Sequence, residues 1–175
     1  MTALITVVAG ICIVAGCTGA GAILAGSLRR RPEELGRLAA ALGQLETEIG
    51  YLASPLPEAL ARVARTTAGP ARDLFAGAGE RLSRQDGATA AEAWSAAVES
   101  ADAGSAWSAA DRQALLDLGA ALGASGRRDQ LQHLAHCRDR LLALQAEARR
   151  EADRSARLWL YLGALGGLGL LIISV

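Results

Sequence analysis

The stretch RREADRSARLWLYLGALGGLGLLIISV, residues 149–175, organises the whole chain. Its charged part contains four arginines, Arg149, Arg150, Arg154 and Arg157. Residues 158–175 carry no charged side chain, and as a helix rising ~1.5 Å per residue they would span roughly 27 Å, about the thickness of a bilayer's hydrocarbon core. Trp159 and Tyr161 stand at the start of this run, where amphipathic rings favour a membrane surface. A buried core helix is the alternative, but so long an uncharged run favours a transmembrane helix over residues 158–175.

The amino-terminal end has the complementary pattern. Residues 2–28 carry no charge, and three arginines, Arg29, Arg30 and Arg31, follow directly. Both arginine groups therefore lie on the sides that face the middle of the chain. Because positive residues collect on the cytoplasmic side of membrane spans, the middle is expected in the cytoplasm. The sequence thus predicts a transmembrane helix in residues 1–28, a cytoplasmic body in 29–157 and a second transmembrane helix in 158–175.

The three cysteines indicate no disulfide framework, because Cys12 and Cys17 lie in the first predicted span and Cys137 lies in the body. The segment VAGC, residues 14–17, has the form of a lipoprotein cleavage site, so lipid attachment at Cys17 is an alternative. The residues after Cys17 stay apolar up to residue 28, whereas a mature lipoprotein usually becomes polar there. No Lys or Arg precedes the apolar run, as one would in a cleavable signal peptide. We therefore expect a membrane span.

The body is expected to be all-α. No segment alternates apolar and polar residues as a strand does, and apolar residues recur at helical spacing throughout. The clearest run is a heptad seam after Pro32, made of Leu35, Leu38, Leu42, Leu45, Ile49 and Leu52, which predicts a helix packed lengthwise on another helix. The segment SPLP, residues 54–57, ends this helix and begins the next.

Turns and caps divide the rest of the body. The segments TAAE, residues 89–92, and SAAD, residues 108–111, have the form of capping boxes that open two further helices. From Arg127 no proline or glycine occurs before Gly163, which predicts one long helix that continues into the second span. The predicted architecture is a six-helix bundle flanked by two transmembrane helices, the last bundle helix being continuous with the C-terminal span.

Catalytic patterns are absent from the sequence. The net charge of zero argues against nucleic-acid binding, and no phosphate-binding loop or family-typical hydrolase spacing occurs. One cluster resembles a metal site: Asp129, His133 and Cys137 share a helix face, with His136 some 60° away. No second group of ligands completes a coordination shell, so the interpretation that these are ordinary surface histidines is favoured. We expect no enzyme activity, cofactor, metal or small-molecule substrate.

Three stretches resemble a known family, the stage III sporulation protein AB family of spore-forming bacteria. They are RRRPEELGRLAAALGQLETEIGYLASPLPEAL in residues 29–60, AAEAWSAAV in residues 90–98, and residues 131–175. The length and order of elements are similar over nearly the whole chain. The departure is that arginine supplies all the basic residues and lysine is absent, which preserves charge.

The resemblance implies a function that the periodicity does not. It implies a non-enzymatic scaffold in the mother-cell membrane facing the forespore, part of the channel complex between the two cells. It also implies that the body is similar to the cytoplasmic domain of type II secretion and type IV pilus platform proteins. Its implied partners are a secretion-type ATPase, stage III sporulation protein AA, other channel subunits and membrane lipid. A platform protein of a type II secretion or type IV pilus system is the alternative, although such chains usually carry two copies of the helical body.

Two groups of residues are candidate contact sites. The most recognisable family motif suggests that a partner binds the first body helix and the turn after it, through Glu46, Glu48, Pro55, Leu56 and Glu58. Solvated flank charges are the alternative for the two glutamates. The arginines beside the spans, with Trp159 and Tyr161, are expected at the membrane surface, where cations attract anionic lipid headgroups.

Overall fold

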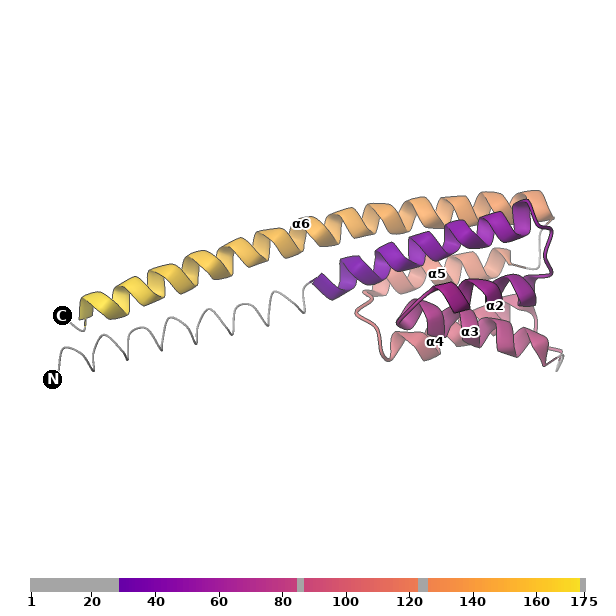
Figure 1. Cartoon of the computed structure of the whole chain (residues 1–175), viewed down its shortest axis with the longest axis horizontal. Helices are drawn as coiled ribbons and strands as arrows, with labels where there is room; N and C mark the ends of the chain where they lie inside the picture. The colour runs from indigo at the N-terminus through magenta and orange to yellow at the C-terminus, as the bar shows by residue number, and fades with distance from the viewer. Residues whose placement is uncertain (1–28, 85–86, 123–125, 174–175) are drawn as a thin grey trace. The chain divides into compact units, whose positions relative to one another are not determined.

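A computed structural model describes residues 29–84, 87–122 and 126–173, and within these ranges helices form and strands do not. The first helix spans residues 29–50. It is followed by α2 (Leu56–Thr66), α3 (Pro70–Ser83), α4 (Ala90–Asp102), α5 (Ala109–Ala121) and α6 (Arg127–Ile173), as Figure 1 shows. The described part of the chain thus confirms an all-α fold with six helices. As predicted from the missing prolines, α6 is a single helix of 47 residues.

The chain divides into two compact units, of which Arg31–Ala146 is the helical bundle. The other unit comprises Met1–Arg30 and Glu147–Val175. Among the described residues, no helix contains an apolar window long enough to count as a membrane span. The predicted span in residues 1–28, the lipid attachment considered at Cys17, and the side chains of Arg157, Trp159 and Tyr161 all lie outside what the structure describes.

The heptad seam of helix 29–50 forms the centre of the bundle. Five of its six members are buried: Leu35, Leu38, Leu42, Leu45 and Ile49. The prediction is wrong for Leu52, whose exposed fraction is 63%. The helix ends at residue 50, so Leu52 belongs to the following turn and its heptad position no longer directs it inward.

Helix 29–50 packs closely against α6 along a row of glycines. A Cβ at Gly36 would contact the amide of Gln145, one at Gly43 would lie 3.9 Å from Arg138 Cδ, and one at Gly50 would lie 3.5 Å from a methyl of Leu131. Both rows advance by seven residues in opposite chain directions, so the two helices are antiparallel. Glycines let the helix axes approach, because no side chain separates them.

The largest aromatic side chain in the core depends on the space that one neighbouring glycine leaves for it. Trp94 on α4 meets Phe75 of α3 edge to face at 5.6 Å and donates its Nε1 hydrogen to the Leu115 carbonyl at 2.7 Å. A Cβ at Gly119 would lie 2.6 Å from Trp94 Cδ1. Position 119 on α5 therefore must be glycine for the indole to keep this orientation.

Both predicted capping boxes are confirmed. The Thr89 hydroxyl accepts from the Glu92 amide and the Glu92 carboxylate accepts from the Thr89 amide, which fixes the start of α4. Ser108 and Asp111 make the same reciprocal pair at the start of α5. Each box satisfies backbone N–H groups that lack a partner inside the helix.

Candidate partner-binding surface

The predicted partner residue Glu46 is bound within the bundle. Its Oε2 atom lies 2.7 Å from Arg138 Nη1 on α6, and both side chains are half-buried. Burial raises the pKa of the Glu46 carboxyl above its ordinary value; the Arg138 charge opposes this shift and the Asp139 charge adds to it. Glu46 therefore serves the contact between helix 29–50 and α6.

Glu48 is likewise engaged, on the opposite flank of the seam. Its Oε2 atom pairs with Arg62 Nε of α2 at 2.9 Å and accepts a hydrogen bond from the Ser54 hydroxyl at 3.2 Å. Arg62 also contacts Ser54 Oγ, and the Ser54 amide donates to the Glu48 carbonyl at 3.2 Å. These contacts tie the end of helix 29–50 to α2 across the intervening turn, which comprises residues 51–55.

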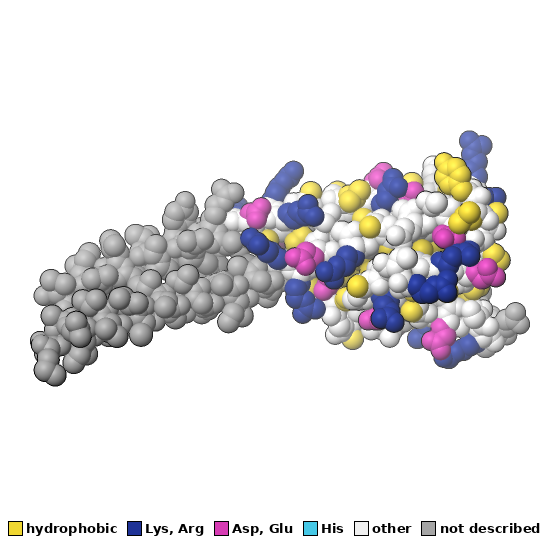
Figure 2. All heavy atoms as spheres, viewed as in Figure 1, with side chains coloured by type: hydrophobic (Ala, Val, Ile, Leu, Met, Phe, Trp, Pro, Cys, Tyr) yellow, Lys and Arg dark blue, Asp and Glu magenta, His cyan; other side chains and the backbone are white. Residues whose placement is uncertain are grey.

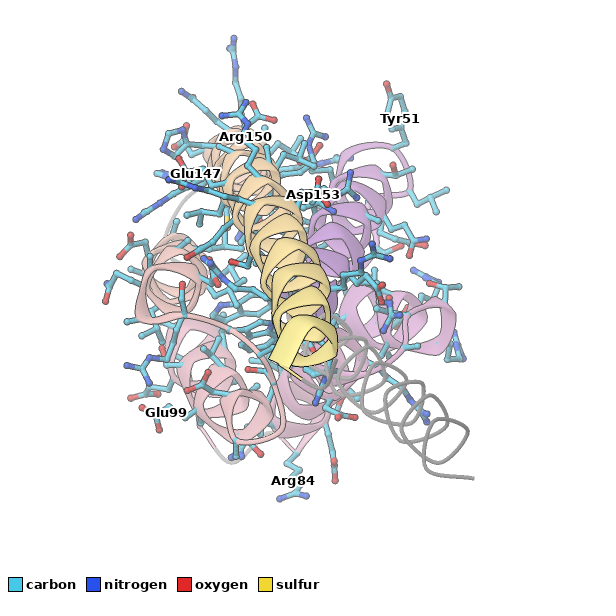
Figure 3. The ribbon with its side chains drawn as sticks, turned by 90° about the vertical axis from the view of Figure 1, so that its left-hand side faces the viewer. Tyr51, Arg84, Glu99, Glu147, Arg150 and Asp153 are labelled. Atoms are coloured by element: carbon cyan, nitrogen blue, oxygen red, sulfur yellow. The ribbon has the colours of Figure 1, made fainter. Side chains whose placement is uncertain are left out.

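The turn itself presents apolar side chains to solvent. Tyr51 is 88% exposed and points away from the ribbon in Figure 3, and Leu52 beside it is also exposed. Ala53 has a φ of +50°, a left-handed conformation that a residue with a Cβ adopts at some energetic expense. Of the predicted partner residues here, Pro55 is exposed and Leu56 is half-buried. The sequence alone did not mark Tyr51 and Leu52 as contact residues. Heptad spacing assigned Leu52 to the core, and no pattern assigned a role to Tyr51.

The remaining predicted partner residue and one arginine complete this end of the bundle. Glu58, in the first turn of α2, is exposed. Arg127, at the start of α6, donates from Nη2 to the carbonyl of Gly50, the residue before Tyr51. The structure thus brings the starts of α2 and α6 together with the end of helix 29–50, a grouping that the sequence order does not reveal.

The arginines predicted at the membrane surface fall into different environments. Arg29 and Arg30 are exposed, as are Arg149, Arg150 and Arg154. Arg31 instead pairs with the fully buried Asp111: Nε lies 2.8 Å from Oδ2 and Nη2 lies 3.0 Å from Oδ1. This pair links the start of helix 29–50 to the start of α5, a role that the arginine cluster in the sequence does not reveal.

A second polar contact joins the same two parts of the bundle. The buried carboxylate of Glu34 accepts a hydrogen bond from the amide of Ala106 at 2.8 Å. Arg31 Nη2 further contacts Ser108 Oγ at 3.0 Å. The loop between α4 and α5 is therefore anchored to helix 29–50 through charged groups, which hold it more specifically than apolar packing alone.

The structure does not assemble the metal-like cluster. Cys137 is buried, its thiol lies 3.5 Å from the Ala114 carbonyl, and burial raises its pKa to about 12. Asp129, His133 and His136 are exposed. No group of three or more metal-ligating side chains occurs in the part of the chain that the structure describes. The Cys137 thiol therefore packs inside the bundle while the two histidines face solvent.

The surface of the bundle carries no single-sign charged region on the face that Figure 2 shows, where arginines and carboxylates are interspersed. Several of them pair: Arg112 with Asp102 at 3.0 Å, and Arg140 with Asp117 at 2.9 Å. Such exposed pairs contribute little to stability. Among the described residues, the turn at residues 51–55 stands out because it places two large apolar side chains, Tyr51 and Leu52, next to each other in solvent.

Comparison with known proteins agrees with this architecture. The family model described as stage III sporulation protein AB matches residues 6–175. The chain is 28% identical to the stage III sporulation protein AB of Bacillus subtilis (strain 168) over 161 residues, which cover 92% of this chain and 94% of that protein. A solved structure of stage III sporulation protein AB (SpoIIIAB) superposes with a TM-score of 0.66 at 27% identity, covering 71% of this chain and 97% of the solved one. The chain therefore belongs to the stage III sporulation protein AB family.

Proposed function

We propose that this protein is a non-enzymatic scaffold subunit of the channel complex between mother cell and forespore, required for endospore formation. The observation that carries this proposal is the match to a stage III sporulation protein over nearly the full length of both chains. The bundle supports it: its polar contacts, as far as the structure describes them, serve helix caps and helix–helix contacts. The protein would act by recruiting and aligning other subunits.

The proposed topology follows from the sequence. Residues 1–28 and 158–175 cross the mother-cell membrane that faces the forespore, and residues 29–157 lie in the cytoplasm. The exposed Arg29, Arg30, Arg149, Arg150 and Arg154, together with Arg157, would contact anionic headgroups. In vegetative cells that express the chain with serine at positions 12 and 17, a membrane-impermeant thiol reagent tests this with a cysteine introduced at the exposed position of Ala40. Labelling only after the membrane is opened is expected, and labelling of intact cells would reverse the topology.

The proposed partner is the secretion-type ATPase of the same system, stage III sporulation protein AA, which would meet the bundle on the cytoplasmic side. The proposed contact surface comprises the end of helix 29–50 and residues 51–58, including Pro55, Leu56 and Glu58. Glu46 and Glu48 would contribute to it through their bonds to Arg138 and Arg62.

Two experiments test the function. Deletion of the gene should abolish heat-resistant spores, and re-expression of the full chain should restore them. The full chain, purified in detergent from sporulating cells, should retain the ATPase, whereas a detergent-matched preparation from cells lacking the tagged chain should not. Normal sporulation of the deletion strain would overturn the proposal, and loss of spores without ATPase binding would overturn the proposed partner alone.

A further inference from the structure

Large apolar side chains that face solvent are few in the described part of the bundle. They are Tyr51, Leu52 and Leu142, and the first two are neighbours in one turn. Burying a tyrosine and a leucine together would remove substantial apolar area from water, which favours association. A pair of such residues at a protruding turn therefore differs from the isolated exposed leucine on α6.

Side-chain contacts brace the turn within the bundle, with no partner present. Glu48, Ser54 and Arg62 connect its two ends, and Ala53 occupies its left-handed conformation between them. Pro55 adds a fixed φ at the start of α2. A contact surface fixed in this way loses little conformational entropy on binding, which strengthens the complex.

A cation lies beside the exposed pair. Arg127 is exposed, and its bond to the Gly50 carbonyl uses one of the five N–H donors of its guanidinium. Tyrosine and arginine, together with tryptophan, are enriched among the residues that dominate the binding energy of protein interfaces. A partner surface complementary to this one would offer an apolar pocket for Tyr51 and Leu52 and carboxylates at the rim of that pocket for Arg127.

The position of the turn in the bundle indicates what kind of partner can bind it. Residue 50 faces Leu131 and residue 36 faces Gln145, so the ends at which the chain enters and leaves the unit, Arg31 and Ala146, lie at the opposite end from the turn. The intervening helix of about 20 residues is roughly 30 Å long. Figure 1 shows the turn at the end of the bundle where α6 begins. Under the proposed topology, the turn therefore lies at the end of the bundle farthest from the points where the chain continues into the predicted spans, on a surface that a cytoplasmic protein can contact.

We propose that Tyr51 and Leu52 insert into an apolar pocket with an acidic rim on a separate protein, that Arg127 contacts this rim, and that Glu48 and Arg62 position the turn without touching the partner. The identity of that partner as the ATPase rests on the proposed function. The residues proposed to touch the partner are thus Tyr51 and Leu52 of the turn and Arg127 of α6, whereas Glu48 acts through its intramolecular bonds.

Binding of the purified secretion-type ATPase to the full-length chain in nanodiscs tests the contact residues. We expect Tyr51→Ala and Leu52→Ala each to weaken binding about tenfold or more, while the matched control Leu142→Ala changes it less than twofold. Arg127→Glu should weaken binding and reduce its dependence on salt. Circular dichroism should be unchanged, because all of these side chains are exposed. Unchanged binding by Tyr51→Ala and Leu52→Ala would overturn the inference while leaving the proposed function intact.

A charge exchange tests the positioning role. Glu48→Arg and Arg62→Glu should each weaken binding, and the double variant should restore it, because the pair re-forms with its signs reversed. Failure of the double variant to recover, with the bundle folded, would mean that Glu48 contacts the partner directly and would overturn the positioning role.

The number of heat-resistant spores formed by a Tyr51→Asp strain tests the docking role of the turn independently of whether the partner is the ATPase. If the wild-type chain does not bind the ATPase but Tyr51→Asp abolishes heat-resistant spores at normal protein levels, the turn docks a different protein and only the proposed partner fails. If the wild-type chain does not bind and the Tyr51→Asp strain sporulates normally, both are overturned.

Discussion

Replacing Asp111 by alanine should destabilise the bundle far more than the same change at Asp117, although both aspartates lie on α5 and pair with an arginine. Asp111 is fully buried and accepts both Arg31 contacts, at 2.8 and 3.0 Å, together with the Ser108 amide at 2.8 Å. Removing one partner of a buried pair typically destabilises a protein by about 3–5 kcal/mol. Because the Arg31 side chain is 27% exposed and keeps some hydration, the expected loss is about 2–4 kcal/mol.

Thermal unfolding of the full chain in detergent, followed by circular dichroism, measures the difference. At about 4 °C per kcal/mol for a domain of this size, Asp111→Ala should lower the Tm by roughly 8–16 °C. The control Asp117→Ala removes a pair whose side chains are both largely exposed, and its Tm should fall by no more than about 2 °C. Equal shifts for the two variants would refute the assignment of Arg31–Asp111 as a structural pair.

The same pair predicts a pH dependence. Burial alone would raise the pKa of Asp111, but hydrogen bonds from Arg31 and Ser108 and the charge of Arg31 outweigh it, so the net pKa is lowered. A lowered folded-state pKa means that the stabilisation is present above the unfolded value, about 4, and is lost as the pH falls through the folded value. The Tm difference between wild type and Asp111→Ala should therefore shrink below about pH 4. A difference that is constant down to pH 2 would show that the carboxylate charge is not involved.

Three further changes test the packing and the caps. Gly119→Ala should lower stability by about 1–3 kcal/mol and change the near-UV signal of Trp94, which its Cβ would meet at 2.6 Å, whereas Gly104→Ala, with open space around its Cβ position, should leave both unchanged. In a variant whose two amino-terminal cysteines are serines, Cys137 should react with a maleimide only as the bundle opens, because burial raises its thiol pKa to about 12; rapid labelling in the native state would contradict its burial. Thr89→Ala should reduce the unfolding free energy by about 1 kcal/mol and Thr89→Asn should not, since asparagine retains the cap; equal losses would argue against the capping box.

Several elements followed directly from local sequence rules. The leucines from residue 35 to residue 45 and the two capping boxes depend on spacings of three or four residues, and these spacings correspond to physical contact within one helix. The uninterrupted course of α6 followed from the absence of proline and glycine. The prediction failed at Leu52 because periodicity does not state where a helix ends: the chain leaves the helix at residue 50, and the next heptad position faces water.

The sequence was sufficient to locate the candidate site along the chain, but it was not sufficient to assign a role to each residue of the site. The segment 46–58 was identified from its motif. No spacing along the chain indicates that Glu46 pairs with Arg138, 92 residues away, or that Arg127 reaches the carbonyl of Gly50. Both contacts join helix 29–50 to α6, the two helices farthest apart in the body's sequence. Whether this segment binds a partner is still a prediction.

By itself the sequence determined that the body is helical, where two of its caps lie, and most of the residues that turn inward, because these properties depend on neighbours within one or two helical turns. Only the tertiary structure decided which charges are structural and which surface is free. From the sequence, Arg31 was predicted at the membrane surface, and Glu46 and Glu48 at a partner contact or on a solvated flank. The packing of helix 29–50 against α5, α6 and α2 instead places an opposite charge beside each of them. The physical reason is that an ion pair requires two side chains to meet within a few ångströms, and that proximity is set by how the helices pack, not by the spacing along either one.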